Sequence, residues 1–302
     1  MSNGTGRPTL HGAFTALVTP FAADGSLDEA SLRQLVRWQV LAGIDGLVPC
    51  GTTGESPTLT QAERDRVIAL TVETVAERPS RSRVTVIAGT GTNDTAATIA
   101  ATRRAAELGA DAALVITPYY SRPTQEGLYR WYGAVAREFP DLPIVIYNVP
   151  VRTAVDVAPE TVARLCRDFD NVVGIKETTR DFEHVSYVLR EAGTDFIEIP
   201  GEMVALCAAA RAGDWDTARR IHDRWLPLFR ANFAGGPNPV PVKAALSMIG
   251  LIGDVLRPPL LPLEESARQS LADVLRQAGL VELSGGRIVR TERTDVGEQV
   301  VA

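Results

Sequence analysis

Lysine is rare in this chain, and the place of one lysine gives the first indication of chemistry. Of the 31 basic residues, only Lys176 and Lys243 are lysines, and the others are arginines. Lys176 lies in VVGIKET (172–178), at the end of an apolar run that predicts a buried strand. A lysine amine can lose its proton and become a nucleophile, which distinguishes it from a guanidinium. A desolvated lysine at a strand end therefore suggests attack on a carbonyl group through an imine.

A tyrosine ends the predicted strand before Lys176. Tyr147 closes an apolar run that begins at Ile144, and sequential strands are usually neighbours in space. Neighbouring strands lie about 4.8 Å apart, so Tyr147 and Lys176 can reach one small substrate if both point to the same face. The alternative for Lys176 alone is a side chain that extends past the strand end to water. The scarcity of lysine and the adjacent tyrosine favour the catalytic interpretation.

Polar, glycine-rich or proline-rich segments follow several predicted strands, namely CGTTGE, GTGTND, TPYY, YNVP and KETT. Each segment by itself is ordinary turn chemistry. Five such segments at carboxyl ends of strands point instead to one face of a parallel α/β barrel, where active sites of that fold lie.

Candidate binding groups lie within one of these segments and just after another. GTTGE (51–55) offers successive backbone N–H groups and the hydroxyls of Thr52 and Thr53, a suitable seat for a carboxylate. Arg152, just after YNVP, can hold a second carboxylate bidentately, with a solvent-facing arginine as the alternative. GTTGE lacks the GK[ST] of a Walker loop and GTGTND lacks the third glycine of a dinucleotide fingerprint, so no cofactor is expected.

Strands and helices that alternate along the chain must position these residues. Seven strands are predicted, at Phe14–Val18, Gly46–Cys50, Val84–Ala88, Ala113–Ile116, Ile144–Tyr147, Val172–Lys176 and Phe196–Ile199. They recur about every 30 residues, the size of one strand–helix unit. Such alternation implies a parallel sheet covered by helices, either doubly wound or closed into a barrel. The even spacing favours the barrel.

Start and stop signals mark the helices between these strands. Ser26 with Glu29 and Thr60 with Glu63 fit capping boxes. Glycines at positions 109 and 193 are expected to end helices.

The strand pattern stops at about Gly213. Two amphipathic segments, DWDTARRIHDRWLPLFRANF and LEESARQSLADVLRQAGL, predict helices separated by the loop GGPNPVP. The predicted organisation is a catalytic barrel over 11–213, a helical domain over 214–282 and a polar, mobile tail over 283–302.

Composition excludes several classes of function. The chain has 302 residues, is 45% hydrophobic and carries a formal charge of −6, which argues against a nucleic-acid or anionic-membrane partner. Its three cysteines and three histidines lack metal-ligand spacing, so no metal is expected, and reduced thiols fit the cytosol. MSNGTGRPTL lacks the apolar core of a signal peptide, and no apolar run approaches the roughly 20 residues of a membrane span. A cytoplasmic protein is therefore expected.

Taken together, the motifs resemble those of a known family. GTTGESPTL, AGTGTNDT, TPYYSRPTQEGLY, YNVPVRT, GIKE and PNPVPVK are similar to segments of the dihydrodipicolinate synthases. These belong to the pyruvate-dependent class I aldolases, to which N-acetylneuraminate lyase is also related. The similarity runs from about Gly12 to Leu280. It implies a (β/α)8 TIM barrel with a C-terminal helical domain, in a homo-oligomer that is a tetramer or dimer.

The resemblance also implies a reaction. Members of the family condense pyruvate with L-aspartate 4-semialdehyde to 4-hydroxy-tetrahydrodipicolinate, a step of lysine and diaminopimelate biosynthesis. Lys176 matches the lysine that forms a Schiff base with pyruvate, and Tyr147 matches the tyrosine that shuttles protons to and from it. Thr53 matches the threonine that binds pyruvate and relays protons, with Thr52 beside it in the relay motif.

Further positions match on the same basis. Tyr120 matches the relay tyrosine that a neighbouring subunit inserts into the site. Arg152 matches the arginine that binds the carboxylate of the semialdehyde. Lys243, in PNPVPVK, is interpreted as a structural residue that seats the C-terminal domain against the barrel.

The chain departs from the family pattern near residue 200. DFIEI runs almost directly into PGEMVALCAAARAGD, which resembles the helix after the eighth strand, so one strand–helix unit of about 25 residues is missing. The pyruvate-contacting backbone carbonyl then has no secure counterpart, with Ile197 or Ile199 as substitutes. We expect a seven-stranded, imperfectly closed barrel with a seam between FIEI and the strand Phe14–Val18.

Two other functions remain open from the sequence. One is another pyruvate-dependent aldolase, or a 2-keto-3-deoxy acid lyase or dehydratase, on the same scaffold, since KETTRDFEH leaves the second substrate undetermined. The other is a catalytically impaired paralogue that binds keto acids, which the missing unit suggests and the intact Lys–Tyr–Thr set opposes.

Overall fold

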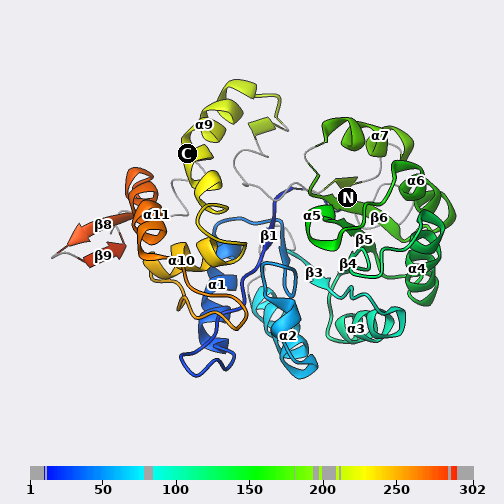
Figure 1. Ribbon diagram of the computed structural model, residues 1–302, viewed down its shortest axis with the longest axis horizontal. Helices are drawn as coiled ribbons and strands as arrows, with labels where there is room; N and C mark the ends of the chain where they lie inside the picture. The colour runs from blue at the N-terminus through cyan, green and yellow to red at the C-terminus, as the bar shows by residue number, and fades with distance from the viewer. Residues whose placement is uncertain are drawn as a thin grey trace. The chain divides into compact units, whose positions relative to one another are not determined.

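The computed structural model describes residues 10, 12–77, 84–179, 181–192, 197–198, 209–210, 212–284 and 287–290. The chain divides into two compact units, drawn together in Figure 1. The first unit contains Met1–Phe14 and Thr85–Gly201, and the second contains Thr15–Val84 and Glu202–Ala302.

The first unit is a parallel α/β assembly. Its strands are β3 (Thr85–Gly89), β4 (Ala112–Ile116), β5 (Ile144–Asn148), β6 (Val172–Glu177) and β7 (Ile197–Glu198). Each strand pairs in parallel with the next one along the chain. The helices between them are α3 (Thr95–Glu107), α4 (Gln125–Glu138), α5 (Pro150–Thr153), α6 (Pro159–Asp168) and α7 (Phe182–Ala192).

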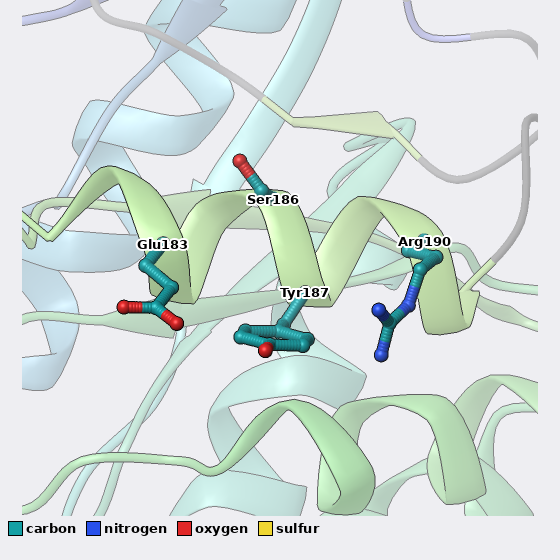
Figure 2. A pocket seen from close by; sticks show the side chains of 4 residues that line it. All are labelled: Glu183, Ser186, Tyr187 and Arg190. Carbon is teal, nitrogen blue, oxygen red and sulfur yellow. The ribbon is translucent and has the colours of Figure 1, made fainter.

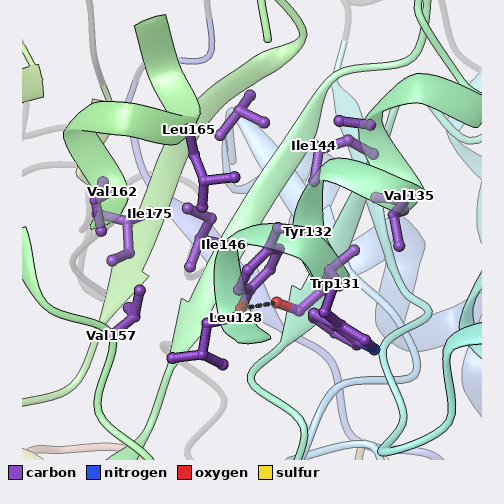
Figure 3. Packing of buried hydrophobic residues seen from close by; sticks show 14 of the residues in the cluster. Leu128, Trp131, Tyr132, Val135, Ile144, Ile146, Val157, Val162, Leu165 and Ile175 are labelled. Atoms are coloured by element: carbon purple, nitrogen blue, oxygen red, sulfur yellow. Dashed lines mark hydrogen bonds between the residues drawn. The ribbon is translucent and has the colours of Figure 1, made fainter. Parts of the chain in front are cut away.

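Buried apolar side chains fix which face of this sheet meets the helices. In Figure 1, α4 and α6 lie along one side of β4, β5 and β6. Figure 3 shows Ile146 and Ile175 from the strands in one cluster with Leu128 and Leu165 from the helices, and all four are fully buried. Because side chains alternate along a strand, the residues next to Ile146 and Ile175 face away from this cluster.

The second unit contains the remaining elements. They are β1 (Phe14–Ala16, which begins at the boundary), α1 (Glu29–Leu41), β2 (Gly46–Val48), η1 (Ser56–Thr58), α2 (Gln61–Ala76), α9 (Trp215–Ala231), α10 (Val240–Met248), α11 (Glu265–Gln277), β8 (Val281–Ser284) and β9 (Arg287–Arg290). Leu17 N donates to Val48 O at 3.1 Å, which joins the ends of β1 and β2. A cluster that includes Met248, Leu271 and Leu275 packs α10 against α11.

All seven predicted strands are present, with ends shifted by one or two residues. Two of the predicted helix signals have the expected geometry. Thr60 and Glu63 form a complete capping box at the start of α2, and Gly109 follows α3 with φ +89°. Position 193 lies outside the described residues.

The predicted capping box of Ser26 and Glu29 is wrong. The residue that caps α1 is Asp28, whose carboxylate accepts a hydrogen bond from Ser31 N at 3.0 Å. Ser26 instead donates its hydroxyl to Asp24 at 2.6 Å. Aspartate is a strong N-cap and stands directly before the helix, so the serine two residues earlier remains in the preceding turn.

The C-terminal region confirms both predicted helices, as α9 and α11. α10 begins inside the predicted loop, at Val240. The expectation that no strand follows residue 213 is wrong, because β8 and β9 form an antiparallel hairpin. Apolar and polar residues alternate in VELS, the period of a strand, and RIVR contains two adjacent β-branched residues, which favour strands, although the stretch is polar overall. The predicted boundary at 213/214 stays a prediction, and 291–302 lie outside the described residues.

Candidate active site

Lys176 and Tyr147 are brought together by strand register. They are direct partners across the parallel pair β5–β6. Both follow helix-facing isoleucines, so both point to the opposite face of the sheet. Lys176 Nζ lies 4.5 Å from the centroid of the Tyr147 ring, and Tyr147 is only 6% exposed. The predicted juxtaposition of an amine and a phenol at the strand ends is therefore present.

Burial lowers the pKa of this amine. Desolvation lowers the pKa of Lys176 from its ordinary value to about 8. At that pKa about a tenth of the amine is neutral at pH 7, against less than 0.1% for an ordinary lysine. Among the residues that the structure describes, no carboxylate contributes to this shift. A buried amine without a counter-ion stays available for attack on a carbonyl group.

The next residue on each strand forms a second pair on the helix-facing side. Asn148 and Glu177 are also direct register partners, and Asn148 Nδ2 donates to Glu177 Oε2 at 2.9 Å. Neither residue is among those predicted from the sequence. Their position directly after Tyr147 and Lys176 was the available signal, because alternation sends the two pairs to opposite faces.

The GTTGE segment of the second unit is held in a constrained loop. Thr53 Oγ1 accepts a hydrogen bond from Asn238 Nδ2 at 2.9 Å, and Thr19 Oγ1 donates to Gly54 O at 2.7 Å. A Cβ at Gly54 would lie 3.2 Å from Leu17 O and so requires a shift of the loop. Close backbone approach therefore favours glycine at this position.

Lys243 occupies a very different environment from Lys176. It is fully buried, and its Nζ donates to Glu55 Oε1 at 2.6 Å, to Thr19 O at 2.9 Å and to Val255 O at 2.6 Å. These bonds tie α10 and the segment after it to the loops after β1 and β2 within the second unit. The structural interpretation of Lys243 is consistent with these bonds.

Two other predicted site residues are exposed. Tyr120 is 89% exposed and has a left-handed backbone with φ +73°. Arg152 lies on α5, directly after β5, and is exposed as well. Among the six predicted site residues, direct contact is established for Lys176 and Tyr147. Thr52 and Thr53 lie on the second unit.

A shallow pocket lies elsewhere on the first unit, on α7. Figure 2 shows its four lining side chains, Glu183, Ser186, Tyr187 and Arg190. The Arg190 guanidinium lies 4.6 Å from the centroid of the Tyr187 ring. The pocket contains none of the predicted site residues, so the candidate active site is the Lys176–Tyr147 pair and not this pocket.

The sequence model of the Dihydrodipicolinate synthetase family matches residues 9–199 and 197–278. A 4-hydroxy-tetrahydrodipicolinate synthase of Nitratidesulfovibrio vulgaris (strain DP4) is 45% identical over 296 residues, which cover 89% of this chain and 99% of that protein. The two matching segments meet at β7, where the sequence predicts a missing strand–helix unit.

Solved structures of similar proteins agree. The crystal structure of dihydrodipicolinate synthase from Aquifex aeolicus has a TM-score of 0.83 at 37% identity, covering 88% of this chain and 97% of that chain. The chloride-inhibited dihydrodipicolinate synthase from Acinetobacter baumannii, complexed with pyruvate, has a TM-score of 0.83 at 37% identity. The match covers 90% of this chain and 99% of that chain. The likeness confirms the predicted fold class of TIM-barrel type with a C-terminal helical region. The chain belongs to the dihydrodipicolinate synthetase family.

Proposed function

We propose that the protein condenses pyruvate with L-aspartate 4-semialdehyde to 4-hydroxy-tetrahydrodipicolinate. The observation that carries the proposal is the desolvated amine of Lys176, 4.5 Å from the Tyr147 ring centroid. Relatives that are 45% identical over nearly their whole length bear the name of this synthase, and a structural relative is described in complex with pyruvate.

The neutral Lys176 amine attacks the ketone carbon of pyruvate, and the resulting carbinolamine loses water to give an imine. Removal of a proton from the methyl carbon gives an enamine, whose carbon forms a bond to the aldehyde carbon of the second substrate. The amino group of that substrate then displaces Lys176 from the imine, which closes the ring and frees the amine. Tyr147 transfers protons in these steps, a role that its place beside the amine, 4.5 Å from Lys176 Nζ to the ring centroid, supports.

The remaining site residues have proposed roles that rest on the family resemblance. Thr53 binds the pyruvate carboxylate and, with Thr52, relays protons. Arg152 binds the carboxylate of the semialdehyde, and its exposed position on α5 suits a substrate that binds after pyruvate.

Arg152→Ala should then raise the KM for the aldehyde and leave pyruvate binding unchanged. Equal loss of pyruvate binding would remove Arg152 from this role.

We propose a homo-oligomer, a tetramer or a dimer, in the cytoplasm. Tyr120 supports the assembly, because its side chain is 89% exposed in the single chain and is free to enter the site of a second copy. None of the helices in the described ranges is long and apolar enough to cross a bilayer. Sedimentation velocity measures the assembly directly, and Tyr120→Ala should lower turnover with the oligomer intact.

Borohydride trapping tests the proposed reaction. Pyruvate followed by borohydride should add one reduced pyruvate adduct to the peptide that contains Lys176, because an imine is reducible. A screen of aldehydes with the pyruvate-loaded enzyme should then give the highest turnover with L-aspartate 4-semialdehyde. A wild-type protein that is not labelled at Lys176, or that prefers another aldehyde, contradicts the proposal.

A further inference from the structure

A buried carboxylate lies on the helix-facing side of the strand that bears Lys176. The Glu177 side chain is only 2% exposed. Its Oε2 accepts from Asn148 Nδ2 at 2.9 Å and lies 3.4 Å from Nε2 of His184 on α7. Removing a carboxylate from water is unfavourable unless it is well hydrogen-bonded. The hydrogen bond from Asn148 satisfies one of its two oxygens.

The other oxygen holds the backbone where the chain leaves β6. Glu177 Oε1 accepts from the backbone N–H groups of Thr178 and Thr179, each at 2.8 Å. Thr178 Oγ1 in turn donates to the backbone carbonyl of Asn148 at 3.0 Å. The carboxylate therefore fixes the exit of β6 and links it to the exit of β5. Tyr147 and Lys176 are the residues directly before this link on the two strands.

Asn148 is itself fixed in one orientation. Its Nδ2 also donates to Asp156 Oδ1 at 2.7 Å, and its Oδ1 accepts from Val157 N at 3.3 Å. Asn148 is fully buried. An amide whose donor and acceptor sides are both engaged cannot rotate without loss of these bonds. It presents a donor, and only a donor, to Glu177.

We propose that Glu177 is a positioning residue for the imine-forming reaction. Its carboxylate, with Asn148, clamps the carboxyl ends of β5 and β6 and so holds the Lys176 amine and the Tyr147 phenol at a fixed separation. Lysine has a flexible four-carbon stem, and a reactive group must be held within about 0.5 Å of its productive position. The inference rests on the proposed function, because it concerns that same pair.

The isosteric change Glu177→Gln separates charge and acceptor capacity from size. Glutamine has one acceptor oxygen, whereas Glu177 receives donors on both oxygens. If the glutamine oxygen accepts from the two backbone N–H groups, the glutamine NH₂ group faces the NH₂ group of Asn148, and two donors oppose each other. If the glutamine oxygen accepts from Asn148 instead, the two backbone N–H groups lose their acceptor. Either arrangement loosens the clamp.

Asn171→Ala provides a matched control at the opposite end of β6. The buried amide of Asn171 donates to the carbonyls of Ala136, Phe139 and Leu142, at 3.0, 2.7 and 3.3 Å. Its loss removes buried hydrogen bonds just before Val172, the first residue of β6, but leaves the Lys176 end intact. A merely structural role for Glu177 predicts the same behaviour for both variants.

The experiment measures the rate of pyruvate-imine trapping in wild type, Glu177→Gln and Asn171→Ala, well below their melting temperatures. Reductive methylation with formaldehyde reports availability of the Lys176 amine, since Lys243 is fully buried. We expect Glu177→Gln to trap pyruvate at least about tenfold more slowly than wild type, which is the scale of a lost orientation. The methylation rate of Lys176 in Glu177→Gln should stay within about twofold of wild type. The trapping rate of Asn171→Ala should also stay within about twofold of wild type.

Each outcome decides a separate point. Wild type that does not trap pyruvate contradicts the proposed function, and the inference falls with it. Normal trapping by Glu177→Gln, or equal slowing in Asn171→Ala, overturns the positioning role alone. If Glu177→Gln fails to fold, Asn148→Ser removes the link from Glu177 to β5 but keeps the backbone bonds of Glu177. That variant should also slow trapping, and a normal rate would overturn the inference.

Discussion

The two lysines of this chain are both largely removed from water, Lys243 completely and Lys176 in part, but they are stabilised in opposite ways. Lys243 donates to one carboxylate and two backbone carbonyls, and its charge is paired with Glu55 at 2.6 Å. Lys176 has no such acceptor among the described residues, and it lies against the face of the Tyr147 ring. Burial lowers the pKa of both amines, but Glu55 acts in the opposite direction on Lys243.

This difference separates a lysine paired with a carboxylate from one that burial favours as a nucleophile. A buried ammonium with three good acceptors is held in its charged form and cannot attack a carbonyl group. A buried amine without an anion is pushed toward its neutral form, which is the nucleophile. In this chain, where nearly all basic residues are arginine, the partners of each lysine explain its role better than burial alone.

The largest expected effect is the loss of imine chemistry in Lys176→Arg. Guanidinium stays protonated, so the variant should not be labelled by pyruvate and borohydride, and turnover should fall to background. Mass spectrometry of the labelled peptides gives the result, and circular dichroism checks that the variant is folded. Labelling that persists at Lys243 would reverse the roles of the two lysines.

Lys243→Met should have its effect on stability. Removal of the amine leaves the Glu55 carboxylate buried and partly unpaired, which should lower the free energy of unfolding by about 3–5 kcal/mol. Urea denaturation measures the change. The double variant Lys243→Met/Glu55→Gln removes the orphaned charge and should recover part of the loss. An unchanged midpoint for Lys243→Met would show that the pair contributes little.

Tyr147→Phe tests the partner of the reactive lysine. The ring that lies beneath the amine is retained, so pyruvate should still be trapped at Lys176. Turnover should fall by about 100-fold, the usual scale for a lost proton-transfer group. Steady-state kinetics and trapping are measured on the same preparation. Near-normal turnover would place proton transfer on another group.

The smallest expected effect is a gain of stability in Lys176→Met. The pKa of Lys176 is about 8 in the folded protein and about 10.4 in an unfolded chain, so the folded state disfavours the ammonium wherever both states are protonated. At pH 7 the variant should be more stable by about 2 kcal/mol, a figure reduced for the partial exposure of the side chain.

The pH dependence gives the sign of this effect. Below pH 8, Lys176 is protonated in both the folded and the unfolded state, and its burial lowers the stability of wild type in full. As the pH rises from 8 toward about 10.4, Lys176 loses its proton in the folded state first, and the loss of stability disappears. Unfolding free energies of wild type and Lys176→Met, measured from pH 7 to pH 10, should therefore converge. A constant difference would mean that Lys176 is not desolvated.

Much of the fold follows from local patterns that the sequence carries. Short apolar runs define the seven strands, and the spacing between them allows only helical connections that return to a parallel sheet. The capping box at Thr60 follows from two side chains three residues apart, so it is visible in the sequence. The capping box predicted at Ser26 is wrong because Asp28, a better N-cap, lies directly before the helix.

The sequence by itself determined the chemistry that is possible: a lone lysine at a strand end, a tyrosine at the end of the preceding strand, and motifs that identify the family. Tertiary structure decided which lysine is paired with an anion, because acceptors for Lys243 come from residues as far away as Thr19 and Glu55. It also revealed the clamp of Glu177 and Asn148, which depends on register between two strands. The physical reason is that pKa and orientation depend on partners distant in the chain, whereas strand formation depends on neighbours.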